Sequence, residues 1–244
     1  MTHLPLNAIF TLAWRNLWRN HRRTIIMLAA ITLGVWAMIF MTALMRGMVD
    51  DMIANGIRSL PGQAQIHHPG YKDDPSINNS MPPPDKKLLA ALSHPDIKAW
   101  TQRVSVPAVI SSERESRGVA LIGIDPAEDS KLAFDIDSII DGRYLDGSDD
   151  NGIILGAKMV ERLETRLGKR IVIMSQDPEN NLADRGFRIV GIYKAKLASL
   201  EEMYVYAGID TVQQFLNMGH SISEIAATGE DYRDISRWYP QLEQ

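Results

Sequence analysis

The most constraining feature of this sequence is an uncharged stretch near its N-terminus, Ile25 to Leu44. It contains twenty residues, and charged side chains resume on either side, at Arg22 and Arg23 and at Arg46. A helix rises ~1.5 Å per residue, so this stretch would be about 30 Å long, which matches the hydrocarbon thickness of a bilayer. The stretch therefore predicts a transmembrane helix.

Two other structures could account for an apolar stretch. A buried helix of a soluble domain usually shows a polar edge to water, and this stretch has none. A secretory signal peptide has an apolar region of roughly 7 to 15 residues that ends at a small-x-small cleavage site. Here the apolar region is longer and ends Met41-Thr42-Ala43-Leu44-Met45, which is a poor cleavage site. The transmembrane helix is the favoured interpretation.

The flanking charges predict how this helix is oriented. Arg15, Arg19, Arg22 and Arg23 precede it, whereas Arg46 is soon followed by two aspartates. Because positive charge is retained in the cytoplasm, we expect a cytoplasmic N-terminus. The chain from about Arg46 onward should then lie outside, in the periplasm of a bacterium whose inner membrane holds the helix.

Composition agrees with one anchor attached to a water-soluble region. The hydrophobic share is 45% and the mean hydropathy is −0.14, both too low for a protein with many spans. The absence of cysteine excludes a disulfide framework and thiol chemistry. A net charge of −4 argues against nucleic acid as a partner.

An amphipathic helix is expected over residues 7–20, just before the apolar stretch. Apolar residues recur there at helical spacing, and arginines and asparagines occupy the opposite side. The same pattern would suit packing against a cytoplasmic protein, and the two interpretations are compatible. Six side chains are predicted at the membrane surface: Trp14, Arg15, Trp18, Arg19, Arg22 and Arg23.

The run LAWRNLWRNHRRT from Leu12 to Thr24, followed by Leu33-Gly34-Val35, resembles the start of permeases in the MacB/FtsX/LolC-LolE superfamily of ABC transporters. The resemblance continues through Gly-Arg-x-Leu, Ile-Ile-Leu-Gly-Ala and Phe-Arg-Ile-Val-Gly-Ile further along the chain, to about residue 230. It implies an α+β fold in which the interfacial helix and one transmembrane helix precede a two-lobed periplasmic domain. In that domain a porter-like α+β lobe would hold an inserted, mostly β, sabre-like lobe.

The resemblance also implies a division of the chain. The predicted segments are a cytoplasmic amphipathic helix (1–23), the transmembrane helix and its periplasmic extension (24–60), the first half of the porter-like lobe (61–108), the sabre-like lobe (109–200), the second half of the porter-like lobe (201–230) and the start of a further helix (231–244). Three more membrane helices follow in the family. The chain is therefore expected to be either a truncated or a shortened relative.

Local patterns predict several elements of the periplasmic part. A strand is expected over residues 63–68, and Asp85 should cap a helix over Lys86 to Leu92. An extended segment over 97–110 should be interrupted at Pro107. A helix is expected over 157–167, with Gly168 as its C-cap.

A β-hairpin is expected near residue 180. Ile171 to Met174 and Phe187 to Tyr193 should be its strands, joined by a polar loop from Ser175 to Gly186. In the lipoprotein-releasing branch of the superfamily, such a loop docks a periplasmic carrier. The docking residues would be Gln176, Asp177, Pro178, Asn180 and Asn181, although any hairpin needs a connector.

The residues give little support for catalysis. No Gly-x-x-x-x-Gly-Lys-Ser/Thr motif is present, so ATP should be bound by a partner subunit and this chain should need no cofactor. His67 and His68 would point to opposite faces of a strand, which argues against a metal site. Three carboxylate pairs are read as solvated surface: Glu113 and Glu115, Asp149 and Asp150, and Glu201 and Glu202.

The resemblance thus implies a non-catalytic permease that works with an ABC ATPase subunit and a second permease, identical or paralogous. Lipoprotein release toward the outer membrane is the favoured function, with a periplasmic carrier as a further partner. MacB-type efflux of a small molecule or peptide, an FtsX-like signalling permease, and a single-span anchored interaction domain without a transporter are the alternatives.

Overall fold

The computed structural model describes residues 6–59, 62–132, 136–229, 235 and 238–242. Its contacts divide the chain into two units, Met1–Ala54 and Asn55–Gln244. We describe each unit by itself.

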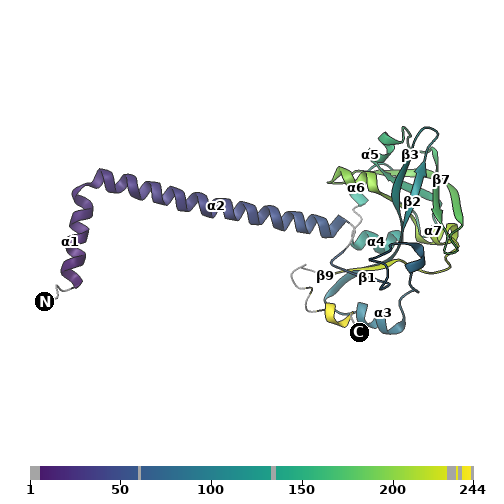
Figure 1. The fold of residues 1–244 in the computed structure, drawn as a ribbon, viewed down its shortest axis with the longest axis horizontal. Coiled ribbons are helices and arrows are strands. Elements are labelled where there is room, and N and C mark those ends of the chain that lie inside the picture. Colours follow the sequence, from purple (N-terminus) through teal and green to yellow (C-terminus); the bar gives the residue numbers. More distant parts are fainter. Residues whose placement is uncertain (1–5, 60–61, 133–135, 230–234, 236–237, 243–244) are drawn as a thin grey trace. The chain divides into compact units, whose positions relative to one another are not determined.

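Two helices make up the first unit. α1 spans Leu6–Arg19, and α2 spans His21–Ser59, a length of 39 residues that extends into the second unit (Figure 1). At ~1.5 Å per residue, α2 is about 58 Å long, roughly twice the hydrocarbon thickness of a bilayer. The predicted helix and its continuation past residue 47 are confirmed. Thr42 Oγ donates to Met38 O at 2.8 Å, so this polar side chain is satisfied inside the helix.

The second unit is built on one mixed sheet of nine strands in the described part of the chain. The strands are β1 Ala64–His67, β2 Ile97–Ser111, β3 Ser116–Ile124, β4 Ile139–Gly142, β5 Gly152–Gly156, β6 Arg170–Gln176, β7 Leu182–Tyr193, β8 Tyr204–Gly208 and β9 Glu224–Gly229. The helices are α3 Lys86–Leu92, α4 Pro126–Leu132, α5 Ala157–Arg162, α6 Ala198–Met203 and α7 Ile209–Phe215, with short 3-10 turns at Ile77–Asn79, Ile136–Ser138 and Tyr239–Gln241.

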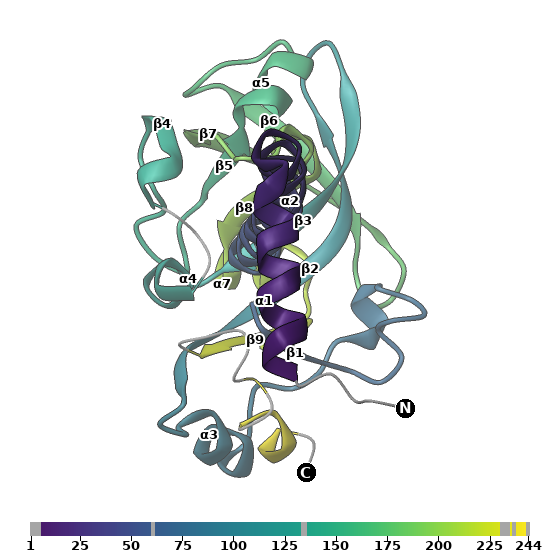
Figure 2. The ribbon, with the colours of Figure 1, turned by 90° about the vertical axis from the view of Figure 1, so that its left-hand side faces the viewer.

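Six of these strands close into a barrel. β6 pairs with both β2 and β7, so the hydrogen-bonded order β2-β3-β8-β5-β7-β6 returns to β2. Alternate residues along the barrel strands are buried and form one cluster, as expected for side chains that fill a small barrel. They include Val106, Ala108, Ile110, Leu121, Ile153, Leu155, Ile171, Ile173, Phe187, Ile189 and Val205. α3, β1 and β9 lie at one end of this unit, and α5 lies at the opposite end (Figure 2).

Several predicted elements are confirmed. β1 falls within residues 63–68, and α3 has the predicted bounds, with the Asp85 carboxylate accepting from Leu88 N at 2.8 Å. The boundary expected at residues 108 and 109 falls inside β2. The division into porter-like and sabre-like lobes stays a prediction. The start of the predicted C-terminal helix, near Tyr232, lies outside the described residues.

The helix predicted over residues 157–167 is shorter than expected. α5 ends at Arg162, and Glu164 adopts a φ of 46°, which a continuing helix cannot accommodate. The prediction that Gly168 caps this helix is therefore wrong. Gly168, with a φ of 79°, instead forms the turn into β6, where its N–H donates to Ile189 O at 2.8 Å.

Candidate docking groove

A gap along one edge of β2 creates the candidate site. On the edge away from β3, β2 pairs with β9 through Arg103 and with β6 from Val109 onward. Within the described part of the chain, residues 104–108 have no strand partner on that edge. The gap leaves room for a surface groove in an otherwise continuous sheet.

Pro107 explains why the pairing between β2 and β6 stops. Ser175 Oγ donates to Pro107 O at 2.8 Å, so the carbonyl of Pro107 faces β6. The nitrogen of the same residue faces the same side of an extended strand, and in proline it carries no hydrogen to donate. The prediction that Pro107 interrupts the strand is therefore wrong, because β2 continues through Pro107, which pairs with Ala120 of β3. What is interrupted is the backbone pairing on the edge of β2 that faces β6 and β9.

Side chains satisfy the rest of the exposed β2 edge. Ser105 N donates to Ser223 Oγ at 3.0 Å, and Ser105 O accepts from Ser223 Oγ at 3.1 Å and from the Tyr71 hydroxyl at 3.3 Å. Ile77, in the 3-10 turn of the connection before α3, is buried beside this edge. The backbone is thus satisfied without a strand, and the groove stays open.

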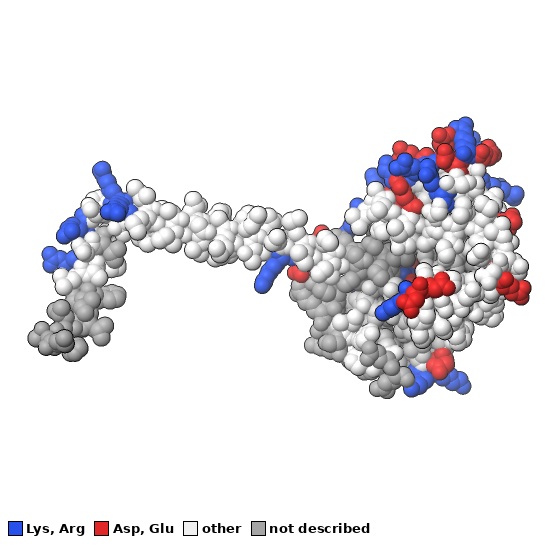
Figure 3. Space-filling view, in the orientation of Figure 1, with Lys and Arg blue, Asp and Glu red and all other residues white. Residues whose placement is uncertain are grey.

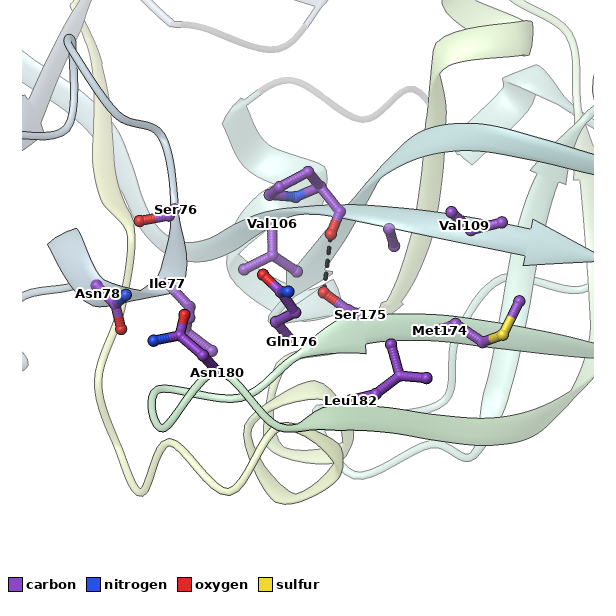
Figure 4. Close-up of a pocket in the computed structure, with 12 residues that line it drawn as sticks. Ser76, Ile77, Asn78, Val106, Val109, Met174, Ser175, Gln176, Asn180 and Leu182 are labelled. Atoms are coloured by element: carbon purple, nitrogen blue, oxygen red, sulfur yellow. Dashed lines mark hydrogen bonds between the residues drawn. The ribbon is translucent and has the colours of Figure 1, made fainter.

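The groove has a volume of about 460 Å³ and lies between this connection and the β6–β7 hairpin. Figure 4 shows residues from the connection, from β2 and from the hairpin around it. Its apolar side chains come mainly from β2, β6 and β7, and its polar rim comes from the turns. The lining residues are Ser76, Ile77, Asn78, Val106, Pro107, Ala108, Val109, Met174, Ser175, Gln176, Asn180 and Leu182. Val109 is 39% exposed and Leu182 is 73% exposed, so apolar surface is available to a partner.

The tip of the hairpin is a short, hydrogen-bonded turn. The prediction of a polar loop from Ser175 to Gly186 is wrong in length, because β6 continues to Gln176 and β7 begins at Leu182. Asp177 organises the five residues between them by accepting from Glu179 N at 2.9 Å and Asn181 N at 2.8 Å. The Asn181 side chain donates to the same carboxylate at 3.1 Å. This side-chain bond, together with the backbone donors, holds the pKa of Asp177 below its ordinary value.

The five predicted docking residues therefore divide by position. Gln176 and Asn180 line the groove, and Asn180 adopts a φ of 62° at the tip. Asp177 and Asn181 hold the turn, and Pro178 is exposed within it. Their role in docking stays a prediction.

The sequence analysis did not identify the apolar side chains of β2, β6 and β7 that line the groove. The alternation of Val109 with the buried residues Ala108 and Ile110 could have indicated that Val109 faces outward.

The predicted membrane-surface residues lie on the first unit. Trp14 and Trp18 are exposed, with ring centroids 6.1 Å apart, and the side chains of Arg15, Arg19, Arg22 and Arg23 are also exposed. α2 is the one described helix that is long and apolar enough to cross a membrane, and none of its apolar window is buried inside the protein. Contact with lipid at these six positions stays a prediction.

A buried ionic cluster joins β2, α4 and β9, and no local sequence pattern predicts it. Arg103 of β2 is 1% exposed and contacts Asp129 of α4 at 2.6 Å and Glu224 of β9 at 3.5 Å. Burial lowers the pKa of Arg103, but the two carboxylates outweigh this effect and the pKa lies above its ordinary value. The cluster is a structural junction between three elements.

Two carboxylates predicted as solvated are structural. Glu201 is buried and accepts from Lys158 N and Ala195 N, both at 3.0 Å, so it joins the start of α5 to the segment after β7. The side chain of Asp150 is 8% exposed and pairs with Arg143 at 2.6 Å. For these two residues the prediction of a solvated surface is wrong.

The described residues contain no group of three metal-ligating acids or histidines. The ring of His67 stacks on the ring of Tyr71, with centroids 4.6 Å apart.

The helix α2 and the α+β barrel together define a class of protein: a folded domain carried by a membrane-length helix. Comparison with known proteins identifies the family. The model of the MacB-like periplasmic core domain matches residues 24–244, and the chain belongs to this family. The family comprises periplasmic domains of ABC permeases of the MacB/FtsX/LolC type.

Individual relatives agree with this assignment. The chain is 29% identical over 181 residues to the lipoprotein-releasing system transmembrane protein LolC of Neisseria meningitidis serogroup B. That alignment covers 70% of this chain and 40% of LolC, so the chain spans less than half of this relative.

The fold is shared with one solved structure, and a second is similar at a lower score. The periplasmic region of MacB from Actinobacillus actinomycetemcomitans is similar over 73% of this chain and 79% of that one, with a TM-score of 0.50 and 17% identity. The extracellular domain of YknZ, a noncanonic ABC-type transporter from Gram-positive bacteria, covers 71% of this chain and 86% of its own, with a TM-score of 0.48 and 15% identity.

Proposed function

We propose that this chain belongs to a permease subunit that carries movement from a partner ATPase to a periplasmic domain. In this proposal, the N-terminus is cytoplasmic and the helix crosses the inner membrane. ATP binds to the partner ATPase and not to this chain. A second permease, identical or paralogous, completes the membrane unit.

The observation that carries the proposal is the unbroken length of α2. Its 39 residues exceed the ~20 that span a bilayer, so the helix continues well beyond the hydrocarbon core. A continuous helix transmits rotation or translation because its backbone hydrogen bonds resist local bending. A flexible linker at this place would not transmit them.

Interrupting α2 beyond the membrane tests this role. Insertion of Gly-Ser after Gly56 should abolish transport by the full-length permease complex, while co-purification of the ATPase subunit is unchanged. The matched control is the same insertion between Gly219 and His220, in the exposed turn between α7 and β9. Wild-type transport by the Gly56 variant would contradict the proposal.

For the cargo, we propose lipoprotein release, with a soluble lipoprotein carrier docking at the groove beside the hairpin tip. Two observations support this choice: the similarity to LolC, and exposed apolar side chains next to a turn that hydrogen bonds hold in one shape. A preorganised turn loses little conformational entropy when a partner binds.

Charge introduced into the groove tests carrier docking. Val109→Glu and Leu182→Glu should each weaken binding of the purified carrier to the full-length permease at least tenfold, because a carboxylate would be buried in the interface. Leu89→Glu on α3 is the matched control, since Leu89 is 38% exposed, as Val109 is at 39%. Binding measured by surface plasmon resonance that stays within twofold of wild type in both groove variants would argue for a different cargo, such as the small molecules or peptides of MacB-type efflux.

A further inference from the structure

A second pocket lies apart from the docking groove, between the β2–β3 turn and the segment that joins α5 to β6. Its volume is about 270 Å³. It is lined by Ser112, Glu113, Arg114, Glu164, Thr165, Arg166, Lys169 and Arg170, four of which are cationic and two acidic. Figure 3 shows charged side chains gathered at the end of the second unit that carries α5 and the β2–β3 turn.

Three of the four cations in this pocket form no ion pair with the described residues. Arg114 forms an ion pair with Glu164. The side chains of Arg166, Lys169 and Arg170 are exposed, and none has an ion pair or a side-chain hydrogen bond to the described residues. The chain as a whole carries a net charge of −4, so a basic cluster is not a consequence of composition.

The strand register places a further cation beside Arg170. Arg170 of β6 and Arg188 of β7 are direct cross-strand partners, and both side chains are exposed. Like charges placed opposite one another destabilise a sheet. The arrangement costs stability in the free protein, and a bound anion would remove that cost.

The backbone beside the cations is the C-terminal turn of α5. Glu164 has a φ of 46°, a left-handed conformation that a side chain with a Cβ disfavours. It is held there by the ion pair to Arg114 and by Thr165 N, which donates to Val160 O at 3.2 Å. Together with Glu164 N, which donates to Glu161 O at 3.2 Å, this bond forms the ordinary C-terminal turn of a helix, and the turn holds the Glu164 side chain beside Arg114.

We propose that this pocket binds a phosphate group that carries two negative charges. Of the two carboxylates in the pocket, Glu164 pairs with Arg114 and Glu113 offsets the charge of one more cation, so two positive charges remain, and a single further carboxylate would balance only one of them. A phosphate offers several acceptor oxygens and more charge in one compact group, and the guanidinium fork of arginine matches it. The phosphate belongs either to a lipid headgroup or to a soluble phosphate compound. This inference does not depend on the docking groove.

The test uses the full chain in detergent micelles and in nanodiscs. Inorganic pyrophosphate is titrated by calorimetry, and binding to vesicles of phosphatidylcholine with phosphatidic acid is measured by co-sedimentation. Arg166→Gln with Lys169→Gln should weaken binding of the productive probe at least tenfold, because two charge-assisted contacts are lost. Lys72→Gln with Lys98→Gln removes the same charge from exposed positions elsewhere and should leave binding within twofold.

Each outcome decides a separate point. Binding of pyrophosphate indicates a soluble phosphate compound, and binding of phosphatidic acid vesicles alone indicates a lipid headgroup. Binding of neither probe overturns the proposal, as does an equal loss in the control variant. Binding of a polyglutamate peptide alone overturns it in favour of an acidic protein segment. Arg170→Gln repeats the comparison with a single exposed side chain if the double variant fails to fold.

Discussion

Outside the buried cluster, Asp150 combines an ion pair with two hydrogen bonds from backbone N–H groups. Besides Arg143, its carboxylate accepts from Asp146 N at 2.9 Å and from Gly152 N at 2.8 Å. Burial raises the pKa of this carboxyl, but Arg143 and the two backbone donors outweigh burial and lower it below the ordinary value. The ionised form therefore stabilises the start of β5.

Asp150→Asn should lower the free energy of unfolding by about 1–2 kcal/mol at neutral pH, because charge-assisted bonds become neutral ones. The sign of the pH dependence follows from the lowered pKa. The contribution is present above the ordinary aspartate pKa and is lost as the pH falls through the lower folded value. Chemical denaturation at several pH values should show the two proteins converging in acid. Asp149→Asn, at the exposed neighbouring position, is the control, and a loss there of the same size would contradict this assignment.

At the scale of elements, the β6–β7 hairpin shows how the hydrogen bonds of one side chain can close a turn that is shorter than the predicted loop. Asp177 gathers three donors from Glu179 and Asn181, so the turn closes in five residues instead of twelve. The composition predicted a polar loop because the ends of the two strands carry polar residues such as Gln176 and Asp184. Whether such residues belong to a strand depends on pairing with a neighbouring strand, and local sequence does not show that pairing.

Asp177→Ala should loosen this turn without unfolding the barrel, since the side chain is at the surface and bonds only within the turn. Amide hydrogen exchange at Glu179 and Asn181 should become at least tenfold faster. Exchange in β2 and β3 should be unchanged. Asp184→Ala, on the exposed face of β7, is a matched control. Unaltered exchange at the turn would show that the backbone bond between Asn180 N and Asp177 O, 3.0 Å long, suffices to close it.

At the scale of the whole molecule, the buried ionic cluster joins parts that are far apart in sequence. Arg103, Asp129 and Glu224 come from β2, α4 and β9, and the first and last are separated by 121 positions. A buried cation between two carboxylates stabilises mainly by avoiding isolated buried charge. The arrangement makes the fold of residues 97–229 depend on one guanidinium.

Arg103→Ala should destabilise the protein by about 3–5 kcal/mol at neutral pH, because two carboxylates remain buried without a counter-charge. Burial already raises the pKa of Glu224 above its ordinary value, and loss of Arg103 removes the main group that opposes this effect. The deficit should therefore shrink as the pH falls from about 8 to about 5, where the carboxyls take up protons more readily.

Thermal unfolding across this pH range measures the effect. The variant Arg103→Met with Asp129→Leu and Glu224→Gln should recover part of the lost stability, because no buried charge then remains unpaired. A deficit that is independent of pH and is not reduced in the triple variant would mean that Arg103 acts by packing alone.

The sequence by itself determined the features that depend on local pattern. The apolar run predicted α2 and Asp85 predicted the start of α3, because helix length and capping depend on neighbouring residues. Motifs spread along the chain were enough to recognise the permease family. Catalysis was judged improbable from the same local motifs.

The tertiary structure alone decided where the site lies. The closure of six strands into a barrel, the gap that Pro107 leaves in the β2 edge, and the placing of Ile77 beside the hairpin all depend on pairings between distant segments. So does the burial of Arg103, Asp129 and Glu201, three charged residues that local composition assigns to the surface. A charged side chain is buried when a distant partner satisfies it, and that partner is known only once the chain has folded.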